Sequence, residues 1–269
     1  MCEEGGSFGA AFFAFSMNMR NVMEMDLQST ELAFFDEDYW LSHEDYLTAE
    51  QADYDLAEIL RCLGATTGRL LDAPCGTGRL SGRLSLLGFD VDGVDLDPRA
   101  LAVAKGQQQG FTRQVHYVER DLRQLGGLGS YDAVISWFNS FGYFTTSENL
   151  ALVQTYVSLL RPRGVLLINT LDKEVVAQVL DSGALEENMI VGGRQLSLRS
   201  ELVGTRLITT RVGVGNGPDL EKRSSVELFS SSEWTAVLRE LGCTEVTVMQ
   251  REQPSLGDPV AEITVRAVR

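Results

Sequence analysis

Residues 69–79, RLLDAPCGTGR, place a carboxylate, a proline and two glycines on one short stretch of chain. Apolar residues precede the stretch and a helical pattern follows it, so we expect a strand, a tight turn and a helix. Glycines in such a turn let the backbone approach a bound ligand closely. The stretch therefore predicts a cofactor-binding loop.

The glycine spacing argues against a nicotinamide cofactor. From Gly76 the sequence runs GTGRLSG, which places the third glycine one position later than in the pattern G-x-G-x-x-G. Asp72, Asp95 and Asp121 lie in or at the ends of the first three predicted strands, where their carboxylates would face one crevice. Three carboxylates repel a pyrophosphate and favour a cationic ligand. A nicotinamide oxidoreductase remains an alternative, which direct binding of the cofactor would distinguish.

Apolar runs alternate with helical patterns from residue 69 to residue 169. The strand candidates are RLLDA, FDVDGVD, VHYVERD, YDAVISWF and GVLLINTL. Such alternation predicts an α/β fold, a parallel sheet covered by helices on both faces. A further helix is expected from Thr48 onward, and RPRG at 161–164 should end the helical stripe of Leu150, Val153, Val157 and Leu160.

The pattern changes to a period of two between about residues 188 and 230. The runs QLSLRSEL and RLITTRVGV, joined by Gly204 and Thr205, predict an antiparallel hairpin. This excursion either covers the substrate or forms a dimer surface. The chain then returns to a helix, SSEWTAVLREL, and two strands, TEVTVMQ and VAEITVRAV.

The composition of the chain limits the classes of molecule that the protein is expected to bind. The formal net charge of -15 disfavours nucleic acids and anionic membranes, and fits a neutral or cationic small molecule. None of the four cysteines forms a C-x-x-C pair, so no metal site is expected, and the thiols fit a reducing, cytoplasmic compartment. No apolar run approaches the roughly 20 residues that a membrane helix needs. The first two dozen residues are either a disordered start or a mobile lid.

Five motifs follow one another in a familiar order and spacing: LLDAPCGTGR, VDGVDLDP, VERDLRQL, YDAVISWFNSFGYF and LRPRGVLLINT. Together they resemble the class I S-adenosylmethionine-dependent methyltransferases, in particular the small-molecule branch that includes antibiotic and amino-sugar N-methyltransferases. The resemblance implies a Rossmann-like, doubly wound, mostly parallel seven-stranded sheet with an antiparallel insertion late in the chain. It also implies an N-terminal lid or helical segment, 1–60, and a methyltransferase domain, 61–269, with the insertion at about 186–230.

The resemblance implies a set of residues that bind S-adenosylmethionine: Asp72, Ala73, Pro74, Gly76, Gly78, Asp95, Leu96, Asp121, Leu122, Trp137 and Phe138. Asp72 and the two glycines would surround the methionine part, Asp95 the ribose hydroxyls, and Asp121 the adenine amino group. Pro74 stands where many relatives have glycine, a variation common in this branch.

The resemblance also implies substrate contacts from the N-terminal lid and from the loop after the fourth strand: Tyr39, His43, Asn139 and Tyr143. Trp40 and Tyr46 are further aromatic residues that would close over the site. Methyl transfer from a sulfonium is an in-line displacement whose leaving group needs no acid, so alignment and exclusion of water can supply most of the catalysis. His43 is the candidate general base; its alternative role is that of a lid histidine without proton transfer.

Several polar residues have plainer interpretations. Asp97 before Pro98 predicts a helix cap, Asp90 and Asp92 predict solvated charges, and Cys75 predicts a structural thiol. The loop NSFGYF lacks the proline pair of amino-methylating DNA enzymes. We therefore predict methyl transfer to a small molecule of secondary metabolism, with an amine nitrogen favoured, in a protein that can form homo-oligomers. The alternatives are O- or C-methylation, or a cofactor-binding cyclase or non-catalytic relative.

Overall fold

The computed structural model describes residues 33–43, 47–108, 113–181, 183–214, 221–251 and 261–269. The first two dozen residues, Tyr46 and Cys2 lie outside this part of the chain. The helices are α2 Glu37–Ser42, α3 Ala49–Leu63, α4 Ser81–Leu87, α5 Pro98–Gln107, η1 Leu122–Gln124, α6 Thr146–Leu159, α7 Lys173–Val179 and α8 Ser231–Glu240. The strands are β1 Gly68–Asp72, β2 Phe89–Asp95, β3 His116–Glu119, β4 Tyr131–Ser136, β5 Leu160–Leu171, β6 Leu185–Val191, β7 Arg194–Val203, β8 Arg206–Val214, β9 Glu221–Glu227, β10 Glu245–Gln250 and β11 Glu262–Val268.

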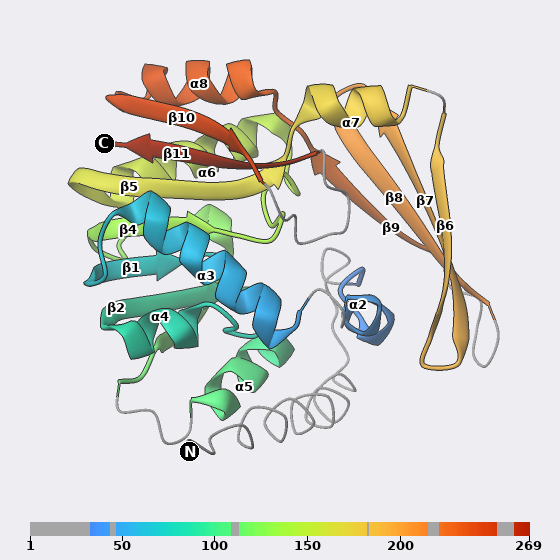
Figure 1. Cartoon of the computed structure of the whole chain (residues 1–269), viewed down its shortest axis with the longest axis horizontal. Helices are drawn as coiled ribbons and strands as arrows, with labels where there is room; N and C mark the ends of the chain where they lie inside the picture. The colour runs from blue at the N-terminus through green and yellow to red at the C-terminus, as the bar shows by residue number, and fades with distance from the viewer. Residues whose placement is uncertain (1–32, 44–46, 109–112, 182, 215–220, 252–260) are drawn as a thin grey trace, which may run out of the picture.

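A seven-stranded sheet forms the centre of the molecule, with the strand order β10-β11-β5-β4-β1-β2-β3 (Figure 1). Neighbours from β5 to β3 are parallel, whereas β11 runs antiparallel to both β5 and β10. The chain order reverses at β1, whose two neighbours are β2 and β4. Such a switch point opens a crevice at the carboxyl ends of the strands. The predicted fold class is confirmed.

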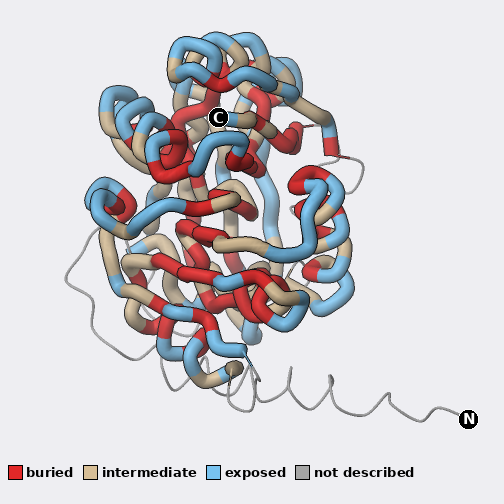
Figure 2. Tube along the Cα trace, turned by 90° about the vertical axis from the view of Figure 1, so that its left-hand side faces the viewer, coloured by how far each residue is buried: buried red, intermediate tan, exposed pale blue. Residues whose placement is uncertain are grey.

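Each face of this sheet has its own hydrophobic core, and the buried residues follow the strands through the middle of the molecule (Figure 2). On one face Tyr156 of α6 and Trp234 of α8 pack with the strands. On the other face Ile59 of α3, Leu84 of α4 and Leu101 of α5 do so. The helices thus cover both faces, as alternation of strands and helices predicts.

The second sheet contains β6, β7, β8 and β9, all antiparallel, and lies beyond the carboxyl ends of the central strands (Figure 1). The predicted hairpin is present, because Val203 pairs with Arg206 across the turn Gly204–Thr205. Gly204 has φ +63, a left-handed conformation that glycine adopts at little cost. Helix α2 lies between the two sheets in the view of Figure 1.

The polar residues that begin the helices explain several boundaries. Thr48 caps α3 and Asp97 caps α5, each accepting a backbone N–H with its side chain, and the cap predicted at Asp97 is confirmed. Helix α6 ends at Leu159, but β5 begins at once with Leu160 and includes RPRG. Leu160 is therefore a strand residue, and Leu150 is 36% exposed, so the predicted stripe was wrong at both ends.

Asp92 was wrongly predicted to be solvated. It is buried within β2, where it accepts hydrogen bonds from Tyr131 Oη at 2.6 Å and from Arg69 Nη2 at 2.8 Å. Asp90, two residues earlier on the same face of the strand, is exposed. Alternation along the strand therefore does not distinguish the two residues. Asp92 is buried by its cross-strand partners Arg69 and Tyr131, which come from distant positions in the sequence.

Cys62, Cys75 and Cys243 are buried free thiols. Among the helices of the described segments, none combines the length and apolar character that crossing a bilayer requires.

A buried guanidinium, that of Arg251 at the end of β10, connects three carboxylates. Its side chain is fully buried and binds Asp55 Oδ1 at 2.7 Å, Glu58 Oε2 at 2.8 Å and Glu262 Oε2 at 2.9 Å. Asp55 and Glu58 come from α3, and Glu262 begins β11. The cluster therefore fixes α3 to the antiparallel end of the central sheet.

We expect Arg251→Met to lower the free energy of unfolding by about 3–5 kcal/mol, because it leaves buried carboxylates without their cation. Arg161→Met is the control, since Arg161 pairs with the exposed Asp132 and such a surface pair contributes less than about 1 kcal/mol. Urea unfolding of both variants measures the difference. Equal effects would contradict the assignment of Arg251 as a buried structural cation.

Candidate active site

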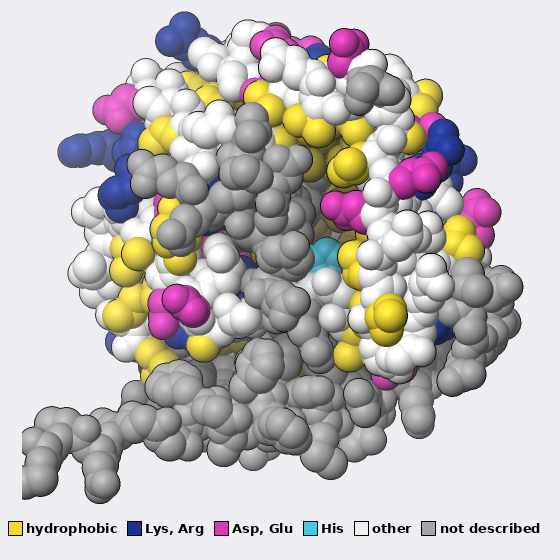
Figure 3. Space-filling model, turned by 45° about the vertical axis from the view of Figure 1, so that its right-hand side comes forward, with side chains coloured by type: hydrophobic (Ala, Val, Ile, Leu, Met, Phe, Trp, Pro, Cys, Tyr) yellow, Lys and Arg dark blue, Asp and Glu magenta, His cyan; other side chains and the backbone are white. Residues whose placement is uncertain are grey.

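A pocket of about 320 Å³ lies at the carboxyl ends of the central strands. Asp72 comes from the end of β1, Asp95 from the end of β2, Asp121 from the loop after β3, and Trp137 from the loop after β4. Figure 3 shows a hollow with hydrophobic side chains around it on this side of the molecule. The pocket is of the size that holds small molecules and cofactors.

The loop between β1 and α4 folds tightly against the end of β2. Gly76 has φ +54 and Gly78 has φ +76, and the Cys75 N–H donates to the Val94 carbonyl at 2.9 Å. A Cβ at position 78 would lie 2.3 Å from the Tyr117 hydroxyl, so only glycine fits there. Pro74 and Gly76 line the pocket, whereas Ala73 and Gly78 are not among its lining residues.

Two carboxylates on this side of the pocket are held in a water-poor environment. Asp72 accepts a hydrogen bond from Ser81 Oγ at 2.5 Å, and burial raises its pKa to about 7. Asp95 accepts the Gly76 N–H at 2.7 Å and the Asp97 N–H at 2.9 Å. Desolvation raises the pKa of Asp95 to about 6 despite these bonds. Both groups gain from a ligand that donates hydrogen bonds or carries positive charge.

Leu96, Asp121 and Leu122 complete this side of the pocket. Asp121 caps η1 and pairs with Arg123 Nη2 at 2.6 Å, and the hydrogen bond from Arg123 lowers the pKa of Asp121. Asp121 is therefore an ionised carboxylate that already has a cationic partner. Its contact with an adenine amino group stays a prediction.

The loop after β4 brings Trp137 and Phe138 to the pocket, but turns Asn139 away from it. Phe138 and Asn139 both have positive φ, +61 and +52. The Asn139 side chain donates to Glu262 Oε1 at 2.8 Å and is not among the lining residues. The structure therefore places Asn139 against β11, where it holds the loop.

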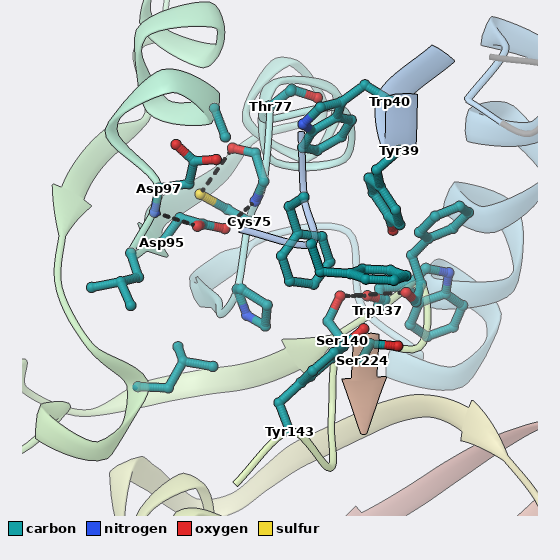
Figure 4. Close-up of a pocket in the computed structure, with 18 of the residues that line it drawn as sticks. Tyr39, Trp40, Cys75, Thr77, Asp95, Asp97, Trp137, Ser140, Tyr143 and Ser224 are labelled. Atoms are coloured by element: carbon teal, nitrogen blue, oxygen red, sulfur yellow. Dashed lines mark hydrogen bonds between the residues drawn. The ribbon is translucent and has the colours of Figure 1, made fainter. Parts of the chain in front are cut away.

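Aromatic residues from the N-terminal segment form the opposite wall. Phe34, Phe35, Tyr39 and Trp40 line the pocket, and Tyr143 joins them from the loop after β4. Figure 4 shows Asp95, Asp97, Cys75 and Thr77 on one side, and Tyr39, Trp137, Ser140, Tyr143 and Ser224 on the other. One side of the pocket is thus rich in carboxylates and the other in aromatic rings.

Charged residues attach this N-terminal segment to the second sheet and to helix α5. Asp36, the cap of α2, pairs with Arg211 of β8 and Lys222 of β9. Arg99 Nη2 of α5 donates to the Phe35 carbonyl at 2.9 Å. The Arg211 guanidinium lies over the Phe34 ring, 4.9 Å from its centroid. These contacts fix the aromatic residues over the pocket.

His43 lies at the end of α2 and is not among the lining residues. Its ring centroid is 4.2 Å from that of Tyr39, and its Nδ1 lies 2.8 Å from the Tyr39 carbonyl oxygen. A carbonyl oxygen only accepts, so Nδ1 carries the proton and Nε2 is the basic atom. Burial lowers the pKa of His43, so the imidazole is neutral at pH 7.

The pocket also contains residues that sequence reasoning did not select as site residues: Phe34, Phe35, Leu47, Cys75, Thr77, Arg79, Leu80, Asp97, Ala100, Ser140, Phe144, Arg223, Ser224 and Ser225. Cys75, Thr77, Arg79 and Leu80 lie in or next to the glycine loop, and this closeness in the sequence could have identified them. Arg223, Ser224 and Ser225 of β9 gave none, because the placement of the second sheet does not follow from its own sequence. In the described part of the chain, no group of three or more His, Cys, Asp or Glu side chains is arranged to bind a metal ion.

Comparison with known proteins shows which family this chain resembles. Residues 70–164 match the family model described as "Methyltransferase domain". The chain is 35% identical over 147 residues to a glycine/sarcosine N-methyltransferase of Halorhodospira halochloris, a match that covers 52% of this chain and 51% of that protein. It is 32% identical over 114 residues to a ubiquinone biosynthesis O-methyltransferase of Xanthomonas campestris, with 42% and 46% covered. The chain thus matches about half the length of these relatives.

Solved structures share the fold over most of the chain. CalS10, an amino pentose methyltransferase of Micromonospora echinaspora with bound S-adenosylmethionine, has a TM-score of 0.62 at 20% identity, covering 91% of this chain and 99% of that one. DesVI of Streptomyces venezuelae has a TM-score of 0.61 at 23% identity, covering 84% and 94%. At these identities the likeness establishes the fold.

The pocket fits the cofactor of this family. The carboxylates of Asp72 and Asp95, both with raised pKa values, suit a ligand with an ammonium group and ribose hydroxyls. The backbone of Gly76, which has a positive φ, lines the same pocket. The resemblance is thereby confirmed: residues 70–164 are similar to a methyltransferase domain, and the chain shares its fold with S-adenosylmethionine-dependent methyltransferases.

Proposed function

We propose that this protein transfers a methyl group from S-adenosylmethionine to an amine nitrogen of a small molecule. The observation that carries the proposal is the two-sided pocket, with carboxylates from the central strands on one side and aromatic side chains from the N-terminal segment on the other. S-adenosylmethionine, when bound, supplies an electrophilic methyl group on a sulfonium. The residues of this chain would bind the cofactor and the acceptor, align the acceptor nitrogen with the methyl group, and exclude water from the site.

On the cofactor side, Asp95 would accept the ribose hydroxyls and Asp72 would face the ammonium group. The backbone of Gly76, fixed by its hydrogen bond to Asp95, would follow the ligand closely. Leu96 and Leu122 offer apolar surface to the adenine. Pro74, Asp121, Trp137 and Phe138 of the predicted cofactor set line the same pocket, whereas Ala73 and Gly78, which do not, would only shape the loop.

The acceptor side favours nitrogen over oxygen. Desolvation raises the pKa of Tyr143 to about 12 and raises that of Tyr39 as well, so both hydroxyls stay protonated at neutral pH. No histidine or lysine is among the described residues that line the pocket. A hydroxyl acceptor usually needs a general base, whereas an amine needs only to bind in its neutral form. The wall therefore suits an amine.

The proposal also assigns roles to the other segments of the chain. Residues 1–60 would act as a lid on a methyltransferase domain, 61–269, and the antiparallel insertion would cover the acceptor. CalS10 is described as involved in calicheamicin biosynthesis, which supports a role in secondary metabolism. The acidic net charge supports a small molecule and not a nucleic acid as substrate, and the buried free thiols fit the cytoplasm. A homo-oligomer is compatible with this role.

Isothermal titration tests the cofactor first. We expect S-adenosylmethionine and S-adenosylhomocysteine to bind, and reduced nicotinamide cofactors not to bind. Asp95→Ala should weaken the binding of S-adenosylhomocysteine by about 1–3 kcal/mol, because it leaves donor groups without an acceptor. Asp90→Ala, at the one exposed position near the start of the same strand, is the control and should not change the affinity.

Formation of S-adenosylhomocysteine in the presence of acceptor panels then tests the reaction. Primary and secondary amines, including amino acids and amino sugars, should support more turnover than phenols and alcohols. Turnover with hydroxyl acceptors alone would favour an O-methyltransferase, as in the ubiquinone biosynthesis relatives. Cofactor binding without turnover of any acceptor would favour a cyclase or a non-catalytic relative.

Binding of S-adenosylmethionine should depend on pH through Asp72. With a pKa of about 7, Asp72 is mostly protonated at pH 5.5 and mostly ionised at pH 7.5, and the cationic ligand requires the ionised form. We expect the affinity to fall by about tenfold or more from pH 7.5 to pH 5.5. Asp72→Asn should bind more weakly at pH 7.5 and show a shallower dependence, centred near the pKa of Asp95. An unchanged slope in this variant would remove Asp72 from the site.

His43 is expected to support Tyr39 and not to move a proton in the reaction, because its ring packs on Tyr39 and does not line the pocket. With an amine acceptor found in the panel, His43→Ala should lower turnover by less than about tenfold. A general base contributes roughly 100-fold or more. A loss of that size, with unchanged affinity for S-adenosylhomocysteine, would instead identify Nε2 of His43 as the base.

A further inference from the structure

Arg79 is a cation on the carboxylate-rich side of the pocket. It follows Gly78 directly in the loop between β1 and α4, and its side chain lines the pocket while being only 15% exposed. Its guanidinium lies over the Phe138 ring, 5.5 Å from the ring centroid. The side chain therefore connects the glycine loop with the loop after β4.

Asp55 of α3 holds this guanidinium in place. Arg79 Nη2 binds Asp55 Oδ2 at 2.6 Å, and the Asp55 side chain is fully buried. Its other oxygen binds Arg251 at 2.7 Å. Burial would raise the pKa of Asp55, but the charges of Arg79 and Arg251 lower it overall. A permanently ionised, immobile carboxylate thus fixes one edge of the Arg79 guanidinium.

The other edge of the guanidinium has an unmet donor. Arg79 Nη1 is buried and has no hydrogen-bond acceptor in the described part of the chain. A buried donor of a charged group without an acceptor costs more than a neutral one, so few native structures keep it without a reason. An acceptor supplied by a ligand would satisfy it.

Asp72 provides the complementary charge nearby. The charge of Arg79 lowers the pKa of Asp72 against the larger effect of burial, so the two groups lie within electrostatic reach of each other. Both line the same pocket. One end of the pocket therefore offers a carboxylate and a guanidinium together, which matches the ammonium and carboxylate of an α-amino acid.

We propose that Arg79 binds the carboxylate of the methionine part of S-adenosylmethionine, and that Asp55 is the positioning residue that orients it. This assignment rests on the proposed function, because it takes the cofactor to be bound with its amino acid end at Asp72. The carboxylate of an acceptor is the other source of the same chemistry, and the experiment below separates the two.

The test compares two ligands by isothermal titration. S-adenosylhomocysteine carries the carboxylate; its decarboxylated analogue keeps the nucleoside, the thioether and the amine but lacks that group. We expect Arg79→Met to weaken S-adenosylhomocysteine binding by at least about tenfold, the effect of losing a hydrogen bond to a charged group. The affinity for the decarboxylated analogue should change by less than about twofold. Arg79→Lys should fall between the wild type and Arg79→Met.

Arg83→Met is the matched control. Arg83 lies four residues further along, pairs with the exposed Asp53 and is not among the lining residues, so this variant should bind both ligands as the wild type does. Asp55→Asn should weaken S-adenosylhomocysteine binding more than binding of the analogue. A role limited to packing would move both affinities together. Thermal unfolding followed by circular dichroism confirms that each variant is folded.

Three outcomes would overturn the assignment. If Arg79→Met bound S-adenosylhomocysteine normally while raising the KM of a carboxylate-bearing acceptor, the guanidinium would belong to the acceptor site. If both ligands lost affinity equally, Arg79 would only shape the loop. If the wild type bound neither ligand, the proposed function would fail, and the assignment of Arg79 with it; a wild type that binds both ligands separates the two failures.

Discussion

The buried guanidinium of Arg251 is the interaction on which the arrangement of the site depends. It binds carboxylates from α3 and from β11, and each of these reaches one loop of the pocket. Through Asp55 it is linked to Arg79 in the glycine loop, and through Glu262 to Asn139 in the loop after β4. A buried cation is tolerated only when each of its hydrogen-bond donors has an acceptor. Helix α3, the end of β10 and the start of β11 must therefore come together in one arrangement. That geometry sets the spacing of the two loops.

A second set of ion pairs governs the opposite wall. Asp36 begins α2 and also binds Arg211 and Lys222, so one carboxylate both starts the helix and attaches it to the antiparallel sheet. The aromatic residues beside it are thereby held over the carboxyl ends of the central strands. Aromatic rings offer large apolar surface at low cost in conformational entropy, which suits a wall that excludes water.

The central fold was predictable because its signals are local. Alternating apolar runs and helical patterns identified the strands of the main sheet, and Asp97 with Pro98 identified the start of α5. The position of the glycine loop located the pocket for the same reason. Contacts between residues far apart in the sequence were not predictable. Asp92 was predicted to be solvated because its partners Arg69 and Tyr131 are distant in the sequence. Residues 223–225 reach the pocket only because the second sheet is placed beside it. Asn139 looked like a contact residue because the positive φ that turns it toward Glu262 leaves little trace in the sequence.

The two walls of the pocket are encoded in separate parts of the chain. The carboxylates come from residues at the ends of the central strands, between Asp72 and Asp121, whereas the opposing surface comes from Phe34 to Trp40, from the loop after β4 and from β9. The hydrogen bonds that hold Asp72 and Asp95 come from Ser81, Gly76 and Asp97, and none of these three residues belongs to the second group. New acceptors can therefore arise by exchange of one wall while the other is inherited unchanged, so the same scaffold can diversify its chemistry without rebuilding its core.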